Sequence, residues 1–260
     1  MKRLVLILFA LLMAKMAVAQ DQAFKEVSIS SAGLSKLVAA VFWGQINVEP
    51  SYTDSIQIDI TYENAEQENL REGLDRLQVE VLEEELVIGS PHPPKGRFES
   101  YLLSIKVPAK LDVKLSMEGG GEIRVTDISG GIEIDNLNGS TYVDGASSWM
   151  TINNFNGEIS VSYSDFTKVK SVSLITFNGG IQLILPHKID GNAILLTKKH
   201  GWIYSDFPVT STRGKAYSNM PRNQYVKRSS KWKGRIGSGG TKIIAMTNNG
   251  PIELLKQNTF

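Results

Sequence analysis

Apolar and polar residues alternate with a period of two along most of the chain, and the alternation restarts repeatedly after glycine. The clearest segments read Gly121-Glu122-Ile123-Arg124-Val125 and Gly157-Glu158-Ile159-Ser160-Val161. Further copies begin at Gly131, Gly180 and Gly250, and looser copies begin at Gly44 and Gly201. A turn followed by a short alternating strand, repeated at a near-fixed step, is typical of coils of sheet stacked in one direction. The pattern predicts an all-β fold, a right-handed β-solenoid similar to a β-helix.

Asparagine precedes glycine at several of these restarts, at Asn138, Asn156, Asn178 and Asn249. The first three, with His200 in the equivalent place, are 18, 22 and 22 residues apart. Asparagine and glycine tolerate positive φ, so these residues suit the corner of each coil. We expect the asparagines around the corners to form ladders between coils. The candidates for such ladders are Asn136, Asn138, Asn153, Asn154 and Asn156.

The pattern before the repeats predicts a β region over residues 20–110 that includes one helix. Strands with one buried side alternate between residues 24 and 62. Leu70, Leu74 and Leu77 share one face of a helical pattern, which predicts a short amphipathic helix over residues 66–76. A strand pair is predicted at 77–82 and 85–88. The proline-rich segment 90–96 then predicts an exposed loop, because proline lacks the N–H donor that a sheet needs.

The repeat region is predicted over residues 111–256, with one interruption at residues 206–236. Basic and aromatic residues replace the regular alternation there, among them Lys231, Lys233 and Arg235 beside Trp232. We expect an irregular excursion over residues 206–223 and a strand over residues 227–235. The alternation then resumes at Thr241 and again at Gly250.

Residues 1–19 predict a secretory signal peptide. Lys2 and Arg3 form a charged start, residues 4–12 are apolar, and Ala17-Val18-Ala19 supplies the small residues of a cleavage site before Gln20. The apolar run is too short to span a bilayer, and no later stretch approaches ~18 consecutive apolar residues. We therefore expect an exported chain in the periplasm, at the cell surface or outside the cell, without a transmembrane segment in its mature form.

Composition narrows the chemistry further. The chain has no cysteine, which excludes a disulfide framework, a thiol nucleophile and a thiolate metal site. It has 28 basic and 27 acidic residues, and removal of Lys2, Arg3 and Lys15 with the signal leaves 25 against 27. This balance argues against a nucleic-acid partner, which would require a basic stripe.

Two stretches resemble a known family. One runs from Leu103-Ser104-Ile105-Lys106-Val107-Pro108 through Leu111-Asp112-Val113-Lys114-Leu115 to Gly121-Glu122-Ile123-Arg124-Val125. The other is the ending, Gly237-Ser238-Gly239-Gly240-Thr241-Lys242-Ile243 and Thr247-Asn248-Asn249-Gly250-Pro251-Ile252-Glu253-Leu254. Over residues 35–256 the chain is similar to the bacterial β-strand-repeat "putative adhesin" domains of unknown function, also called toast-rack domains. The resemblance implies a solenoid-like fold in the envelope or outside the cell, and it implies no catalytic residues.

Paired carboxylates are the first candidates for catalysis, because β-helical folds include polysaccharide-cleaving enzymes. Glu133 and Asp135 lie two residues apart on one predicted strand face, as do Glu122 and Arg124 on the preceding strand. If those strands stack, the four side chains form a charged ladder on the outside of the fold. We interpret that ladder as solvated, because a Glu-x-Asp spacing is common and does not by itself define a cleavage site.

No cofactor or metal site is predicted. His92, His187 and His200 have no partner at metal-ligand spacing. No Gly-x-Ser-x-Gly segment marks a nucleophilic serine.

Aromatic side chains are the better candidates for binding. Phe155 and Phe177 fall within the coils, and we expect them to form core ladders. Trp149, Trp202 and Trp232 are candidates for exposed platforms on which a sugar ring or a partner side chain could lie. With Tyr204, these are the predicted ligand-binding residues.

We therefore expect an exported, non-enzymatic envelope or cell-surface protein with a binding or scaffolding, adhesin-like role. Its partner is an envelope glycan or another protein. Two alternatives remain open at this point. One is a β-helical enzyme acting on polysaccharide through Glu133 and Asp135. The other is an envelope sensor or assembly module that pairs an exposed strand with a protein partner.

Overall fold

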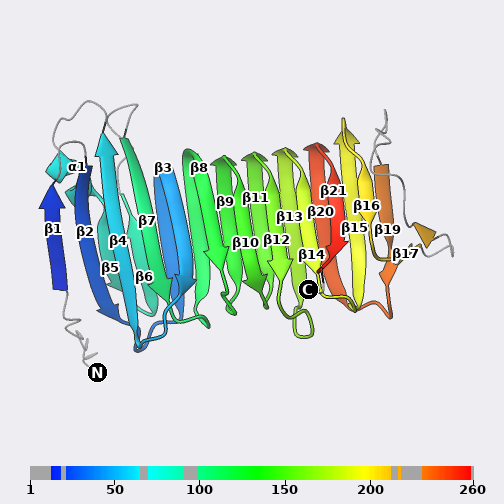
Figure 1. The fold of residues 1–260 in the computed structure, drawn as a ribbon, viewed down its shortest axis with the longest axis horizontal. Coiled ribbons are helices and arrows are strands. Elements are labelled where there is room, and N and C mark those ends of the chain that lie inside the picture. Colours follow the sequence, from blue (N-terminus) through cyan, green and yellow to red (C-terminus); the bar gives the residue numbers. More distant parts are fainter. Residues whose placement is uncertain are drawn as a thin grey trace, which may run out of the picture.

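The computed structural model describes residues 13–18, 22–64, 70–90, 99–211, 216–217 and 230–258. The predicted all-β class is confirmed: strands dominate the described residues, and these contain a single helix. The strands form two layers that lie back to back over the length of the molecule (Figure 1). Apolar side chains from both layers fill the space between them.

Two long strands fix the layers, because each of them runs through both. β3 (Lys36–Pro50) and β8 (Asp112–Thr126) bend near Gly44 and Gly121 and pair in parallel with each other on both sides of the bend. We call the layer that contains residues 36–41 and 112–117 layer A. The layer that contains residues 44–50 and 121–126 is layer B.

Later coils have the same form, with one strand in each layer. In chain order they are β9 (Ile132–Asn138) with β10 (Thr141–Ala146), β11 (Met150–Asn156) with β12 (Ile159–Tyr163), and β13 (Ser171–Asn178) with β14 (Ile181–Leu185). Each strand pairs in parallel with its equivalent in the next coil. Parallel stacking of the glycine-led strands is therefore confirmed, and the right hand of the coil stays a prediction.

The last coil in sequence is not the last coil in space. β20 (Thr241–Asn249) and β21 (Ile252–Lys256) lie between β13–β14 and the coil formed by β15 (Gly191–Lys199) and β16 (Ile203–Ser205) (Figure 1). β19 (Ser230–Ile236) then pairs antiparallel with β15, and β17 (Val209–Thr210) and β18 (Ala216–Tyr217) complete that end. The predicted excursion thus contains short strands, and parts of it lie outside the described residues.

The N-terminal end extends both layers. β6 (Glu85–Gly89) and β5 (Gln78–Leu82) continue layer A beyond β3. β7 (Glu99–Val107), β4 (Ser55–Asn64), β2 (Gln22–Ser30) and β1 (Met13–Val18) continue layer B. β1 falls within the predicted signal peptide, whose cleavage before Gln20 would remove it. Residues 1–12 and 19–21 and the loop at 91–96 lie outside the described residues, and the division at residues 110 and 111 stays a prediction.

The predicted helix is confirmed as α1 (Leu70–Arg76), and residues 66–69 of the prediction lie outside the described residues. Its buried Leu70 and Leu74 pack toward β2 and β4. Arg76 at its end forms an ion pair of 2.8 Å with the buried carboxylate of Glu99. The helix closes the N-terminal end of the apolar interior.

The Asn-Gly pairs form the corners, as predicted. Asn156 Nδ2 donates to Asn138 Oδ1 at 2.7 Å, Asn178 Nδ2 to Asn156 Oδ1 at 2.8 Å, and Asn249 Nδ2 to Asn178 Oδ1 at 2.6 Å. An asparagine ladder therefore crosses four coils in spatial order. In the next coil, Lys199 and not His200 is paired with Asn249 and takes the ladder position. His200, with φ 47°, is an additional residue in that corner.

A second polar ladder lies just inside the corners. Side chains of the next coil donate to the corner glycine carbonyls at 2.9–3.1 Å, in the pairs Asn136–Gly121, Asn154–Gly139, Thr176–Gly157, Thr247–Gly179 and Thr197–Gly250. Asn136 and Asn154 thus bond to backbone and not to one another, and the exposed Asn153 donates to Asp135 instead. The ladder prediction is correct for Asn138 and Asn156 and wrong for these three.

Candidate functional site

The outer face of layer B carries a continuous row of polar side chains. In spatial order it consists of Asn47, Arg124, Tyr142, Ser160, Gln182, Glu253 and Tyr204, each paired in register with the next. We call these seven residues the polar row. Six strand spacings of ~4.8 Å give it a length of about 29 Å.

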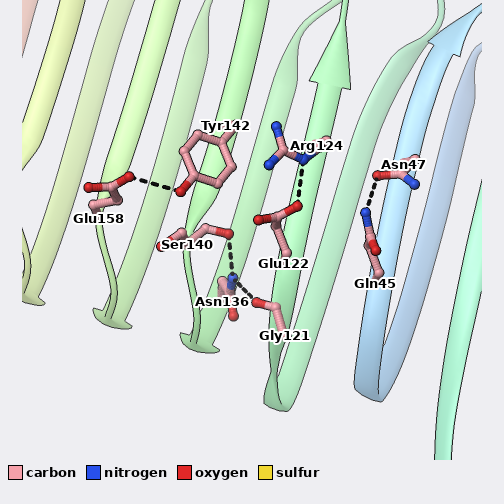
Figure 2. A network of polar contacts seen from close by, with 9 residues as sticks. All are labelled: Gln45, Asn47, Gly121, Glu122, Arg124, Asn136, Ser140, Tyr142 and Glu158. Carbon is pink, nitrogen blue, oxygen red and sulfur yellow. Dashed lines mark hydrogen bonds and ion pairs between the residues drawn. The ribbon is translucent and has the colours of Figure 1, made fainter.

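The first half of the row is a network of hydrogen bonds and ring contacts (Figure 2). Gln45 Nε2 donates to Asn47 Oδ1 at 3.0 Å, and Arg124 Nε donates to Glu122 Oε1. The guanidinium of Arg124 lies over the ring of Tyr142, 4.4 Å from its centroid. These contacts hold long side chains in defined positions on an exposed face.

The hydroxyl of Tyr142 continues the network to the next coil. It donates to Glu158 Oε1 at 2.8 Å (Figure 2). A hydrogen bond with Ser140 lowers the pKa of Tyr142, but the bond to Glu158, desolvation and the nearby carboxylates outweigh it, so this pKa is raised. Tyr142 therefore remains a neutral hydrogen-bond donor at physiological pH.

The second half of the row ends at Tyr204, with a second aromatic side chain beside it. Gln182 Nε2 donates to Glu253 Oε2 at 3.2 Å, and Glu253 is paired with Tyr204. The hydroxyl of Tyr204 donates to Asp206 Oδ1 at 2.8 Å. Trp202 lies two residues before Tyr204, and both are half-buried while Ile203 between them is buried. Two of the four predicted binding residues therefore lie together, at one end of the polar row.

The other two predicted residues are elsewhere. Trp149 is half-buried, and its ring covers Gly131, where a Cβ would lie 2.1 Å from Trp149 Cε2. Trp232 is only 5% exposed and is paired with buried Leu195 in layer A. The expectation that Trp232 is an exposed platform is wrong, because it lies on the inward phase of β19 between outward Lys231 and Lys233.

The outer face of layer A carries large apolar side chains. Leu137, Phe155 and Phe177 follow one another on adjacent strands and are 47%, 49% and 45% exposed. The rings of Phe155 and Phe177 are stacked, 5.1 Å apart and 7° from parallel. The expectation that these two phenylalanines lie in the core is therefore wrong. Ile152 and Leu174 take the inward phase of the same strands.

The predicted carboxylate ladder does not form as one unit. Glu122 and Arg124 lie on the outer face of layer B, whereas Glu133 and Asp135 lie on the outer face of layer A, because β8 bends between its two halves. Glu133 accepts from Lys114 Nζ at 2.8 Å, and Asp135 accepts from Asn153 Nδ2 at 2.9 Å. Each carboxylate of the candidate catalytic pair is thus held by a neighbour on an open sheet face.

A cavity of about 960 Å³ opens where loops 164–167, 186–190, 206–208 and 236–241 meet. Phe166 and Phe207 form part of its wall, and Lys256 Nζ lies 5.4 Å from the Phe207 ring centroid. Backbone and side-chain hydrogen bonds from Thr167 lower the pKa of Asp165 at its rim. His187 lies in this wall, and no group of three or more histidine or acidic residues within the described parts of the chain could hold a metal.

Sequence reasoning did not identify Tyr142, Gln182 and Glu253 as members of a site. The signal was present, because each occupies the second position of an alternating strand that begins after a corner. Aligning the repeats by their corner glycines would have placed the three side chains in one row.

Comparison with known proteins shows the fold. A "putative cell adhesion protein" from Clostridium sporogenes is 13% identical and has a TM-score of 0.51, with 94% of this chain and 100% of that chain covered. A "putative adhesin" from Bacteroides fragilis is 10% identical, with a TM-score of 0.42 and coverages of 90% and 97%.

No protein-family model and no curated protein matches the chain. No helix in the described residues is long and apolar enough to cross a membrane.

The likeness of fold to the putative cell adhesion protein confirms the resemblance to adhesin domains that the sequence shows.

Proposed function

We propose that this chain is a non-enzymatic binding protein of the cell envelope or cell surface, and that it holds an uncharged, hydroxyl-rich polymer such as a glycan along the polar row. The observation that carries the proposal is the row itself, seven polar side chains in register over about 29 Å on the outer face of layer B. Export by the predicted signal peptide would deliver the chain to such a polymer.

The chemistry of the row fits hydroxyl groups. Amide and phenol groups both donate and accept hydrogen bonds, and carboxylates accept them. Tyr142, Trp202 and Tyr204 add aromatic surface for the apolar faces of sugar rings. Because the hydrogen bonds within the row already fix these side chains, little conformational entropy is lost when a ligand binds.

The charge of the row favours a neutral ligand. Glu122, Glu158 and Glu253 lie on or beside it, and Arg124 is paired with Glu122. An anionic polymer would meet uncompensated carboxylates, which repel it. The name of the structural neighbour from Clostridium sporogenes, a putative cell adhesion protein, agrees with a binding role. Glu133 and Asp135, the residues of the enzymatic alternative, lie on the opposite face and are engaged by Lys114 and Asn153.

The test is co-sedimentation of the purified chain with isolated cell-wall polymer, with outer-membrane vesicles in parallel. We expect saturable binding to the polymer that weakens at least tenfold, about 1.4 kcal/mol, in Tyr142→Ala and in Trp202→Ala. Tyr52→Ala is the matched control, because Tyr52 is an exposed aromatic residue outside the polar row, and this variant should bind as the wild type does. Equal binding by all of these chains, or no saturable binding, would contradict the proposal.

A further inference from the structure

The outer face of layer A changes in chemistry from one end of the stack to the other. Acidic side chains are in excess at the β8–β9 end, where Glu118 and Asp135 flank the ion pair of Lys114 with Glu133. The middle strands, β11, β13 and β20, carry exposed or half-buried apolar side chains: Phe155, Ile175, Phe177, Ile244 and Met246. At the far end, β15 and β19 carry basic side chains: Lys198, Lys231, Lys233 and Arg235.

Pairing and burial place these side chains on one face. Lys231 pairs with Leu196 and Lys233 with Ile194, and all four alternate with buried residues such as Trp232 and Leu195. Asp135 pairs with Asn153, which pairs with Ile175, which pairs with Met246. No acidic residue occurs in β13, β15, β19 or β20. The order acidic, apolar, basic therefore runs across successive strands of one sheet.

The apolar patch on the outer face of layer A does not stabilise a monomer, because its side chains remain in contact with water. Apolar side chains in a contiguous patch are exposed at a cost to solubility, and large patches of this kind mark association sites. At the second residue of each described layer B strand β10, β12, β14 and β21, the same coils carry members of the polar row. The two faces of the same coils thus differ in the residues that point outward at equivalent positions.

We infer that two copies of this chain associate face to face through layer A, about a two-fold axis that runs parallel to the strands along β13. Rotation about that axis turns the face over and reverses the strand order. It places β9 opposite the partner's β15 and β8 opposite the partner's β19. Glu118 and Asp135 of each copy then lie near Lys198 and Lys231 of the other, and the apolar middles meet each other.

The face has the size and relief that such an interface needs. From β8 to β19 there are six strand spacings, about 29 Å, and six residues of strand span about 20 Å. The footprint is roughly 600 Å² per copy, so about 1,200 Å² in total, the lower end of stable interfaces.

A groove of about 590 Å³, lined by Phe42, Met117, Leu137 and Phe155 with Glu118 and Asp135, opens over β8, β9 and β11. Side chains of the partner's β15 and β19 would enter it.

This association does not depend on the proposed glycan binding, because the polar row is on the opposite face. A pair would present two polar rows, directed away from each other. Such a dimer would bind one polymer at two sites, or two surfaces at once, and would therefore bind with higher avidity than a monomer.

Sedimentation velocity over a concentration series tests the inference. The wild-type chain should form a dimer. The basic-end variant Lys198→Glu/Lys231→Glu and the acidic-end variant Glu118→Lys/Asp135→Lys should each be monomeric, because the substituted residues then face residues of like charge in the partner copy. An equimolar mixture of the two variants should form a heterodimer, because every contact is again between opposite charges. Glu122→Lys, on layer B, should leave the wild-type dimer intact.

Recovery in the mixture separates loss of the interface from loss of folding, since a misfolded variant cannot be rescued by its complement. A wild-type chain that is still monomeric at about 10⁻⁴ M, where association weaker than about 5.5 kcal/mol would go undetected, would overturn the inference. Unchanged dimers in both variants, or a mixture that stays monomeric, would also overturn it.

Discussion

The rings of Phe155 and Phe177 lie 5.1 Å apart and 7° from parallel, on the outer face of two neighbouring coils. Parallel in-register pairing of β11 with β13 sets this spacing, because equivalent side chains are one strand apart. Each ring covers one face of the other, so the stack reduces the apolar surface that either ring alone would expose.

A double-mutant cycle on this pair should show coupling. Phe155→Ala and Phe177→Ala remove the same ring contact, so the double variant should be less destabilised than the sum of the single variants, by about 0.5–1.5 kcal/mol. Urea unfolding of the four chains measures this energy. It should be done at a concentration low enough to keep the chain monomeric. Strict additivity would mean that the rings do not interact in solution.

The asparagine ladder predicts unequal effects for two asparagines of the same strand. Asn156 donates to Asn138 and accepts from Asn178, so Asn156→Ala leaves two half-buried groups without their partners and should cost about 1–3 kcal/mol. Asn153→Ala removes only an exposed bond to Asp135 and should change stability by less than about 0.5 kcal/mol. Equal losses in urea unfolding would show that the ladder does not stabilise the corners.

The corner glycines predict a severe effect of one added methyl group. Gly157 has φ +127°, and a Cβ there would lie 2.1 Å from the carbonyl oxygen of Gly139 in the preceding coil. Gly157→Ala should therefore cost more than about 3 kcal/mol, because both the backbone angle and the stacking distance must change. Gly33→Ala is the control, since Gly33 has φ +80° but nothing within 4 Å of its Cβ. It should cost about 1 kcal/mol. Comparable melting temperatures for the two variants would contradict this reading of the corner.

Tyr101 predicts a loss of stability at high pH. Burial raises the pKa of Tyr101 to about 12, against the opposing effect of Arg76, and its hydroxyl donates to the carbonyl of Gly73 in α1. An unfolded tyrosine titrates near pH ~10, so the folded chain holds this proton more tightly. The raised pKa of Tyr101 contributes about 2–3 kcal/mol to the free energy of unfolding. This contribution is complete below pH ~10 and is lost as the pH rises to about 12.

Urea midpoints between pH 9 and 12 should therefore fall less steeply in Tyr101→Phe than in the wild type. Buried Tyr163, whose pKa is also raised by burial, titrates in both chains and leaves a residual slope. Tyr52→Phe is the control, because Tyr52 is 96% exposed. Identical pH profiles for the wild type and Tyr101→Phe would contradict the role of this proton.

The sequence predicted the corners well because their requirement is local. An Asn-Gly pair indicates both the backbone angle of the turn and a side chain able to bond to its own copy in the next coil. The phase of the alternation, which decides whether a side chain points into or out of the fold, was harder to assign for aromatic residues. Continuing the period of two from Ile152 places Phe155 outside, yet the usual burial of large aromatic rings led to the opposite expectation. Trp232 is the reverse case. It was expected to be exposed, but the alternation along β19 places its side chain inside the fold.

The spatial order of the coils could not be predicted. β20–β21 takes the position next to β13–β14, and β15–β16 is displaced to the end. Each coil offers its neighbours the same backbone edge and the same corner, so nothing in the local pattern distinguishes these two orders. The polar row depends on this arrangement, because Glu253 lies between Gln182 and Tyr204 only when the last coil is inserted.

Hydroxyl-radical footprinting of the chain, with and without isolated cell-wall polymer, tests most directly whether the polar row binds the polymer. The method reads the solvent access of aromatic side chains on both faces in one experiment. We predict that addition of polymer protects Tyr142, Trp202 and Tyr204 and leaves the oxidation of Phe155 and Phe177 unchanged. Protection of Phe155 and Phe177 without protection of Tyr142, Trp202 and Tyr204, or no change at any of the five, would contradict the assignment of the binding face.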